Sequence, residues 1–128
     1  MLIHTLDSKT NFVDKNNVLV GWDTAQDCCE HACWYVVDEK SKRFDEPLRE
    51  NEDKSNFDLT DYVFDRDYFD KKDTSGENSD VEALKVAFRL VAKGKPNLYL
   101  VLSNSHNGYY KHGFNVEVGG KTIWEGYL

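Results

Sequence analysis

The most constraining feature of the sequence is a pair of short strand-like segments on either side of a diglycine. Residues 114–118, FNVEV, alternate apolar and polar side chains, and residues 121–125, KTIWE, form the returning segment after Gly119 and Gly120. Such an alternation places the apolar side chains on one face of a β-strand. Glycine supplies the positive φ angles that a two-residue hairpin turn requires. We therefore expect a β-hairpin that turns at the diglycine.

A second hairpin is predicted just before the first. Residues 81–92, VEALKVAFRLVA, fit the apolar spacing of a helix and also the alternation of a strand. Residues 94–97, GKPN, form a turn signal, and residues 98–102, LYLVL, have the composition of a strand. Two runs joined by a short Gly-Pro turn are typical of a hairpin, so we favour a strand for 81–92 and keep a helix as the alternative.

The first third of the chain predicts three more strands, at residues 2–6, 17–23 and 33–37. Residues 38–80 are charged and polar, and we treat them as an acidic excursion within the domain. Inside the excursion, the aromatic residues between 57 and 69 follow neither a strand nor a helix period. We expect this part to wrap the core with one short helix or strand.

Length and composition indicate one globular domain over residues 1–128. The chain has 128 residues, of which 40% are hydrophobic and 13% aromatic, enough for a single packed core. The expected fold class is mostly β or α+β, built on an antiparallel sheet with C-terminal β-hairpins and room for one or two short helices.

The charge balance narrows the classes of partner. Sixteen Lys and Arg residues against twenty-three Asp and Glu residues give a formal charge of −7, and the acidic excess is dense between Asp38 and Asp80. An acidic surface repels phosphate backbones, so we expect no direct nucleic-acid binding and consider a basic protein partner instead. The same charge also serves solubility alone.

The compartment follows from hydropathy and cysteine usage. No apolar run approaches the roughly 18 residues of a membrane helix, and the first residues have no secretory pattern. The three cysteines lie within six positions, where adjacent Cys28 and Cys29 would form only a strained ring. We expect a cytoplasmic protein with reduced thiols, no membrane association and no cofactor.

Residues 26–33, QDCCEHAC, hold the densest group of reactive side chains. Structural zinc sites use two ligand pairs separated by a loop, which makes a site from Cys28, Cys29, His31 and Cys33 too crowded. Only a version completed by His106 and His112 is physically attractive. Redox chemistry favours a Cys-x-x-Cys spacing at a helix start, which this segment lacks.

Two other interpretations of this segment remain open. Cys28 or Cys29 can act as a nucleophile if a histidine serves as base and Asp27 or Glu30 orients it. The candidate bases are His31, His106 and His112. Alternatively, the cysteines are small buried residues and the two carboxylates cap a turn.

A second polar segment, residues 105–110, SHNGYY, follows a predicted strand and precedes another. QDCCE at 26–30 together with this segment resembles a family of small uncharacterised phage and bacterial proteins that carry a Gln-Asp-Cys-Cys-Glu box and a Ser-Asn-Gly-Tyr-Tyr box. The resemblance covers about 30 of the 128 residues. Here His106 separates Ser105 from Asn107. The resemblance implies a β-rich domain and carries no activity or partner.

Both segments lie at predicted strand ends, where polar loops gather when the strands are neighbours. We expect them to meet in one polar cluster that orders the fold and forms a shallow pocket. Its expected members are Gln26, Asp27, Cys28, Cys29, Glu30, Asn107, Gly108, Tyr109 and Tyr110. Replacing Asp27 with Ala should then destabilise the protein by about 1 to 3 kcal/mol.

The functional hypothesis is a non-enzymatic binding or interaction protein of phage accessory, inhibitor or immunity type. The acidic surface and the aromatic residues suited to interface anchors favour it. One alternative is a small enzyme with a Cys/His/Asp site at the two boxes. Another is a metal-binding module.

Overall fold

The structure is a computed structural model, and it describes residues 1–25, 31–39, 57–73, 82–106 and 112–128. These residues contain no helix. They form the strands β1 (Leu2–Leu6), β2 (Lys9–Val13), β3 (Val18–Asp23), β4 (His31–Asp38), β5 (Val63–Asp73), β6 (Glu82–Val91), β7 (Leu98–His106), β8 (Gly113–Val118) and β9 (Lys121–Tyr127). The expectation of a β-rich fold built on antiparallel pairs is confirmed.

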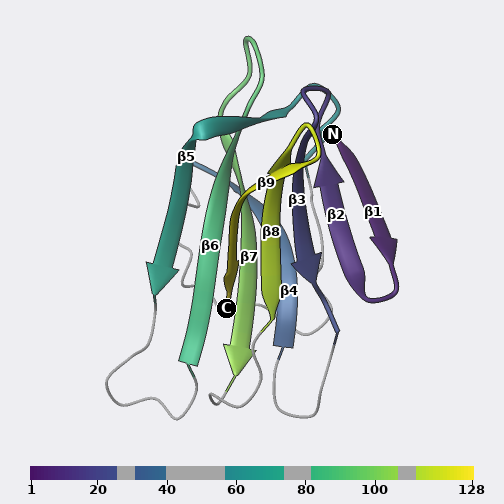
Figure 1. The fold of residues 1–128 in the computed structure, drawn as a ribbon. Helices are drawn as coiled ribbons and strands as arrows, with labels where there is room; N and C mark the ends of the chain where they lie inside the picture. The colour runs from purple at the N-terminus through teal and green to yellow at the C-terminus, as the bar shows by residue number, and fades with distance from the viewer. Residues whose placement is uncertain (26–30, 40–56, 74–81, 107–111) are drawn as a thin grey trace.

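The strands form two sheets that pack face to face (Figure 1). One sheet has the order β1-β2-β3-β8-β9 and the other has the order β4-β7-β6-β5, and neighbours in both are antiparallel. Strands β3 and β8 pair although most of the chain lies between them. The chain therefore crosses from one sheet to the other after β3 and returns before β8.

The register of the five-stranded sheet separates an apolar face from a polar one. Phe12 pairs with Val20, and Val20 pairs with Val116, so one row of side chains runs across three strands into the core. All three are completely buried. Because the side-chain period is two, the rows on either side of this one face outward.

The four-stranded sheet supplies the other half of the core. Its inward residues include Trp34, Phe88 and Leu100, which belong to one buried cluster with residues of the five-stranded sheet. The ring of Phe12 meets the ring of Trp34 edge to face at 5.0 Å, which joins the two sheets directly. A smaller cluster on the outer face of the four-stranded sheet contains Tyr35, Ala87, Tyr99 and Val101.

Both predicted hairpins are present. The β8–β9 turn lies at Gly119 and Gly120, with φ angles of 58° and 84°. Strand β6 covers residues 82–91 and pairs with β7 after a turn at which Gly94 has a φ of 75°. The strand interpretation of 81–92 is therefore correct over 82–91, and between Lys85 and Leu90 every side chain except that of Arg89 is buried on one of the two faces.

Part of the acidic excursion is an integral strand. Strand β5 forms the edge of the four-stranded sheet, and its pairing with β6 shifts register between Phe64 and Phe69. Leu59, Tyr62 and Phe64 are buried in the main core. The register shift explains why the aromatic residues show no single period in the sequence.

Asp14 connects this strand to the rest of the molecule. Its carboxylate accepts hydrogen bonds from the backbone N–H groups of Asn16 and Val18, at 2.9 and 3.0 Å. It also accepts one from the N–H of Phe64 at 2.8 Å. The β2–β3 turn and the start of β5 are therefore held by one buried side chain.

Across the described stretches there is no helix long and apolar enough to cross a membrane.

Candidate functional site

The nine residues of the predicted polar cluster lie outside the described residues. They are Gln26, Asp27, Cys28, Cys29, Glu30, Asn107, Gly108, Tyr109 and Tyr110. The cluster therefore stays a prediction, as does the effect of replacing Asp27. The structure does describe the strands on both sides of each box.

The strand ends that flank the two boxes lie at the same end of the sandwich (Figure 1). Strand β4 begins at His31 and β7 ends at His106, and the two strands are antiparallel neighbours with His31 opposite Ser105. Likewise β3 ends at Asp23 and β8 begins at Gly113, and these strands pair. The chain therefore leaves and re-enters both sheets at this end. The predicted polar cluster needs the strands that flank the two boxes to end on the same side of the molecule, and they do.

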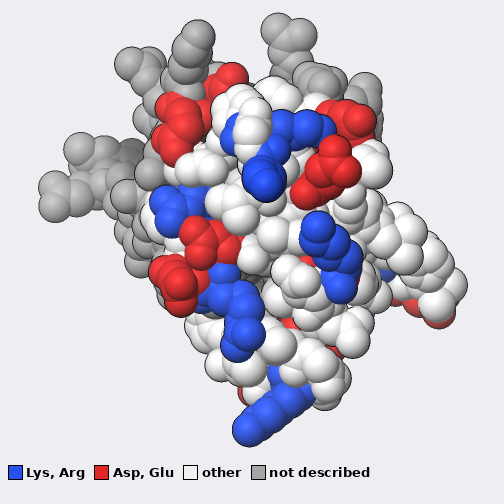
Figure 2. All heavy atoms as spheres, turned by 90° about the horizontal axis from the view of Figure 1, so that it is seen from above, with Lys and Arg blue, Asp and Glu red and all other residues white. Residues whose placement is uncertain are grey.

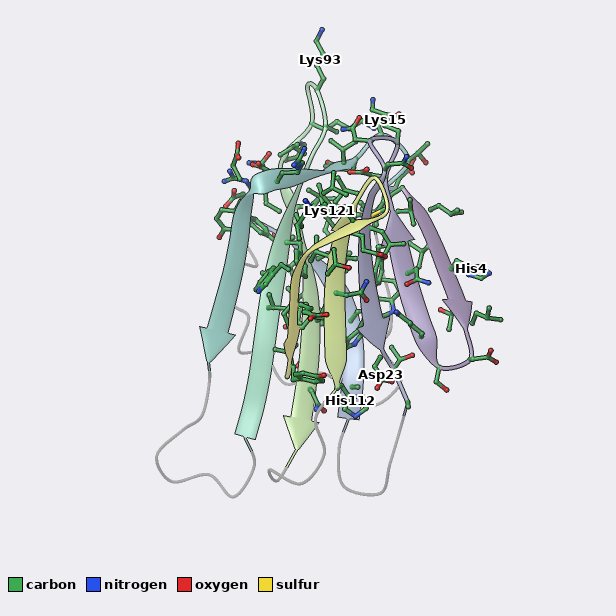
Figure 3. The ribbon with its side chains drawn as sticks, viewed as in Figure 1. His4, Lys15, Asp23, Lys93, His112 and Lys121 are labelled. Carbon is green, nitrogen blue, oxygen red and sulfur yellow. The ribbon has the colours of Figure 1, made fainter. Side chains whose placement is uncertain are left out.

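His112 joins two of these strand ends. Its Nδ1 atom lies 3.0 Å from the carbonyl oxygen of Asp23 and 3.8 Å from a carboxylate oxygen of the same residue (Figure 3). A carbonyl oxygen can only accept a hydrogen bond, so Nδ1 carries the proton in this contact. The imidazole is 3% exposed and its ring lies 6.0 Å from the ring of Trp22.

Further buried hydrogen bonds connect the sheets at this end. The indole Nε1–H of Trp22 donates to the carbonyl oxygen of Cys33 at 3.1 Å. The side-chain amide of Asn104 donates to the carbonyl oxygen of Leu128 at 3.0 Å. Leu128 and His112 also exchange two backbone hydrogen bonds of 2.9 Å. The end of the sandwich next to the boxes is therefore ordered by a polar network.

A groove lies beside this network on the outer face of the five-stranded sheet. It has a volume of about 620 Å³ and crosses the ends of β2, β3, β8 and β9. Its lining consists of residues from the β1–β2 turn and these strands, namely Asp7, Ser8, Lys9, Asp23, Gly113, Phe114, Asn115, Thr122, Glu125, Gly126 and Tyr127. Asp23 belongs both to the groove and to the contact with His112.

The strand register places Gly21 beneath two side chains of the groove lining, those of Lys9 and Asn115. One outward row crosses all five strands and consists of His4, Asn11, Gly21, Asn115 and Glu125. Its central residue has no side chain, and its neighbours lean over it. A Cβ atom built on Gly21 would clash with Oδ1 of Asn115 and would lie 2.9 Å from Cε of Lys9. The absence of a side chain at this position sets the positions of groove-lining groups.

The β1–β2 turn at the rim of the groove is held in a sparsely populated backbone conformation. Asp7 and Ser8 have φ angles of 50° and 64°. Two-residue hairpin turns require such positive values, which residues other than glycine seldom adopt. The carbonyl oxygen of Ser8 accepts hydrogen bonds from the backbone N–H and the hydroxyl of Thr24, at 2.7 and 2.9 Å. Thr24 therefore fastens the turn to the end of β3.

The groove is acidic and carries one large amphipathic side chain. Asp7, Asp23 and Glu125 contribute three carboxylates against the single ammonium group of Lys9. Tyr127 is 67% exposed, and a tyrosine at such a position offers a flat apolar ring and a hydroxyl together. The lining can therefore pack against an aliphatic stem and pair with a positive charge.

The opposite end of the sandwich has a different charge pattern. Figure 2 shows Lys and Arg residues interspersed with Asp and Glu residues around the β6–β7 and β8–β9 turns. Lys95 pairs there with Asp61 at 2.8 Å, and this hydrogen bond holds the pKa of the Asp61 carboxyl below its usual value. The mixed pattern at this end contrasts with the groove, where carboxylates predominate.

An ion pair also stands on the four-stranded sheet. Nε and Nη2 of Arg89 donate to one carboxylate oxygen of Asp65 at 2.9 and 2.6 Å. The hydrogen bonds from Arg89 lower the pKa of the Asp65 carboxyl, although partial burial opposes the shift. The guanidinium carbon lies 4.4 Å from the ring centre of Tyr68.

The structure describes one of the three cysteines on which the metal, redox and nucleophile hypotheses depend. Cys33 is a buried cysteine of β4, and its sulfur is not part of a disulfide. Cys28 and Cys29, which every metal, redox or nucleophilic version needs, lie outside the described residues. Within the described ranges, no group of three or more His, Cys, Asp or Glu side chains is placed to hold a metal ion.

Sequence reasoning did not identify the groove. The outward positions of single strands, such as Lys9, Asp23 and Glu125, are polar as expected for any exposed sheet face. What makes them one site is the pairing of β3 with β8, which joins segments about ninety residues apart. The isolated glycine at position 21 within a strand pattern is the one available signal, because such a glycine marks a close approach.

Comparison with family models, with curated proteins and with solved structures found no match to this chain.

Proposed function

We propose that this chain is a non-enzymatic binding protein that uses the acidic groove to hold a basic segment of a protein partner. The observation that carries the proposal is the lining of the groove, which combines three carboxylates with an exposed tyrosine. A rigid sheet that presents such groups favours recognition of an extended, positively charged chain.

The net negative charge of the whole chain favours a positively charged partner. The formal charge of −7 attracts a basic partner over distances comparable with the Debye length, which is about 8 Å at physiological ionic strength. The same charge opposes nucleic acid. Within the groove, Asp23 lies on β3 and Glu125 lies on β9. A partner segment that contacts both must therefore run across the strands and not along them.

The buried network gives the groove a fixed geometry. The carbonyl of Asp23 is held by His112, and the N–H of Ala25 donates to the Asp23 carboxylate at 3.0 Å. A carboxylate whose backbone is fixed in this way loses little further freedom when a partner binds. Preorganisation of this kind supports binding by a small protein. We place the protein in the cytoplasm, a reducing compartment in which thiols persist.

The test is an NMR titration of the labelled protein with a lysine-rich peptide and with a glutamate-rich peptide of equal length. We expect the lysine-rich peptide to shift the amide signals of Lys9, Asp23, Asn115 and Glu125, and to bind more weakly as salt is added. Shifts confined to other parts of the molecule, or equal binding of both peptides, would overturn the proposal.

Two charge-reversal variants separate the groove from general electrostatics. Glu125→Lys removes a carboxylate from the groove, whereas Asp67→Lys makes the same charge change at an exposed position on β5. We expect the first variant to weaken binding of the lysine-rich peptide about tenfold and the second to weaken it much less. Equal effects would show that net charge alone attracts the peptide.

A second candidate function is a small enzyme with a Cys/His/Asp site at the two boxes. The observation that favours it is the common end at which the strands flanking both boxes lie, next to the buried His112. Alkylation rates of Cys28 and Cys29 test this candidate. Reaction much faster than that of an ordinary thiol would support an activated nucleophile, and the ordinary rate would contradict it.

A further inference from the structure

Strand β1 is an exposed edge of the five-stranded sheet (Figure 1). Two of its leucines, Leu2 and Leu6, are 67% and 61% exposed. His4 lies between them on the same outward face, and its side chain points away from the sheet (Figure 3). An exposed edge strand offers unpaired backbone groups to another strand.

Of the other edge strands, β4 has buried side chains from Ala32 to Val36, whereas β5 and β9 carry exposed charged side chains. On β5 the exposed charges include Arg66 and Asp67, and on β9 they include Lys121 and Glu125. Charges on an edge strand hinder pairing with a further strand. The β1 segment, LIHTL, contains no Lys, Arg, Asp or Glu residue.

The β1–β2 register determines which backbone groups of β1 point outward. Leu6 and Lys9 flank the two-residue turn, so they form a hydrogen-bonded pair. Alternation then directs the N–H and C=O groups of His4 and Leu2 toward β2 as well. The N–H and C=O groups of Ile3 and Thr5 therefore point toward the open edge.

We propose that β1 pairs with β1 of a second copy of this chain, antiparallel and around a two-fold axis at His4. In this register Ile3 of one copy faces Thr5 of the other, and their outward backbone groups form the hydrogen bonds of the new ladder. His4 faces His4 as the pair without hydrogen bonds. The two five-stranded sheets become one continuous sheet with both grooves on the same side.

The side chains favour this register over its neighbours. Leu2 of each copy faces Leu6 of the other, so the dimer covers both exposed leucines at once. A shift of the register by two residues in either direction would place a leucine of one copy opposite His4 of the other. It would also leave another leucine without an apolar neighbour across the seam. Because β1 carries no charged side chain, none of the five residue pairs of the seam brings two acidic side chains together.

The association is weak because one strand pair contributes a small interface. Stable protein complexes bury about 1,200 to 2,000 Å², far more than two five-residue strands supply. Sedimentation velocity from about 10 µM to about 1 mM should therefore show a reversible monomer–dimer equilibrium. Sedimentation as a monomer throughout this range would overturn the proposal.

The charge variant Leu6→Lys tests whether β1 is the seam. Its control is Ile123→Lys, which introduces the same charge at another exposed apolar position, 47% exposed on β9 at the opposite edge of the sheet. We expect Leu6→Lys to weaken dimerisation at least about tenfold and Ile123→Lys to leave it nearly unchanged. A larger effect of Ile123→Lys would place the seam at β9 and contradict the proposal.

Single cysteine variants test the register. The Cα atoms of a cross-strand pair without hydrogen bonds lie about 4.5 Å apart, within the range that a disulfide spans. Under mild oxidation, His4→Cys should form a covalent dimer through the introduced thiols of the two copies, as peptide mapping would show. Leu2→Cys should not, because Leu2 of one copy faces Leu6 of the other.

The native cysteines are the same in both variants and in the unmodified chain, which serves as the baseline. Equal cross-linking of His4→Cys and Leu2→Cys would indicate a parallel or unspecific contact and would overturn the two-fold register. These outcomes do not depend on the proposed function, because the groove and the β1 edge are tested by different residues.

Discussion

His112 and Asp23 are in contact across the paired ends of β8 and β3, although 89 positions separate them in the sequence. The imidazole Nδ1–H donates to the Asp23 carbonyl oxygen at 3.0 Å, inside a site where the histidine is 3% exposed. The contact joins the buried network to the groove, because Asp23 belongs to both. Changes at His112 should therefore affect stability and groove geometry together.

Replacing His112 with Phe should destabilise the protein by about 1 to 3 kcal/mol. The ring keeps its bulk, but the Asp23 carbonyl loses a buried donor. His112→Asn should be less harmful than His112→Phe, since an amide N–H can reach a similar position to Nδ1. Urea denaturation of the three proteins measures the difference. Equal stability of the wild type and His112→Phe would show that the hydrogen bond contributes nothing.

Replacing Asp14 with Ala should cause a larger loss, about 2 to 4 kcal/mol. Its carboxylate accepts three backbone hydrogen bonds, and the N–H groups of Val18 and Phe64 are buried. Without the carboxylate these donors have no acceptor. Thermal unfolding and urea denaturation should both report the change.

Asp58→Ala is the matched control for Asp14→Ala. Asp58 also accepts from a backbone N–H group, that of Thr60 at 3.0 Å, but this hydrogen bond is exposed. Water can replace the lost acceptor there, so little change in stability is expected. If the two substitutions had similar effects, burial of the Asp14 hydrogen bonds would not be the cause.

Most of the strands can be predicted because their signals are local, although the sequence-based predictions missed β2, whose segment KTNFV is mostly polar. Both C-terminal hairpins and the strands near residues 2–6, 17–23 and 33–37 follow from alternation, β-branched composition and turn residues. Strand β5 is harder to predict, because a register shift interrupts its alternation between Phe64 and Phe69. A pattern argument assumes one uniform period and fails where the ladder is irregular.

The groove could not be predicted because it depends on long-range pairing. Nothing local indicates that Gly21 lies beside both Asn11 and Asn115, and only the strand order β2-β3-β8 brings them together. Reactive cysteines draw attention in a sequence, whereas plain polar residues on sheet faces do not. Physical proximity between distant strands, and not unusual chemistry, forms this site.

The ion pair of Asp65 and Arg89 should make stability depend on pH. The hydrogen bonds from Arg89 lower the folded-state pKa of Asp65. The stabilisation is therefore present above the unfolded pKa of about 3.9 and is lost as the pH falls through the folded-state value. Asp65→Asn should reduce stability by about 1 kcal/mol at pH 7, a modest value because the pair is partly exposed.

The difference between wild type and Asp65→Asn should shrink as the pH falls below the unfolded-state pKa of about 3.9 and toward the lower folded-state value. Urea denaturation at pH 7 and at acid pH measures it. In an Arg89→Met background, Asp65→Asn should have little effect at either pH, since the partner is absent. A difference that persists at acid pH would contradict this assignment.

Two glycines of the five-stranded sheet should respond differently to alanine, because an added Cβ atom would point into the core at one and toward the outer face at the other. A Cβ atom at Gly126 would lie 2.9 Å from the ring atoms Cε1 and Cζ of Phe114. That ring is 4% exposed and packs edge to face on Trp124 at 5.0 Å, so it cannot easily move. Gly126→Ala should therefore destabilise the protein by about 1 to 3 kcal/mol.

A Cβ atom at Gly21 instead meets the flexible side-chain ends of Asn115, Lys9 and Asn11 on the exposed face. These groups can swing away into solvent, and alanine also restricts the unfolded chain, so Gly21→Ala should leave stability nearly unchanged. It should still displace groups that line the groove. Urea denaturation tests the expected stability, and a large loss would show that these side chains are rigidly held. The NMR shifts of Asn115 test the groove, and unchanged shifts would show that Gly21 does not position the groups that line it.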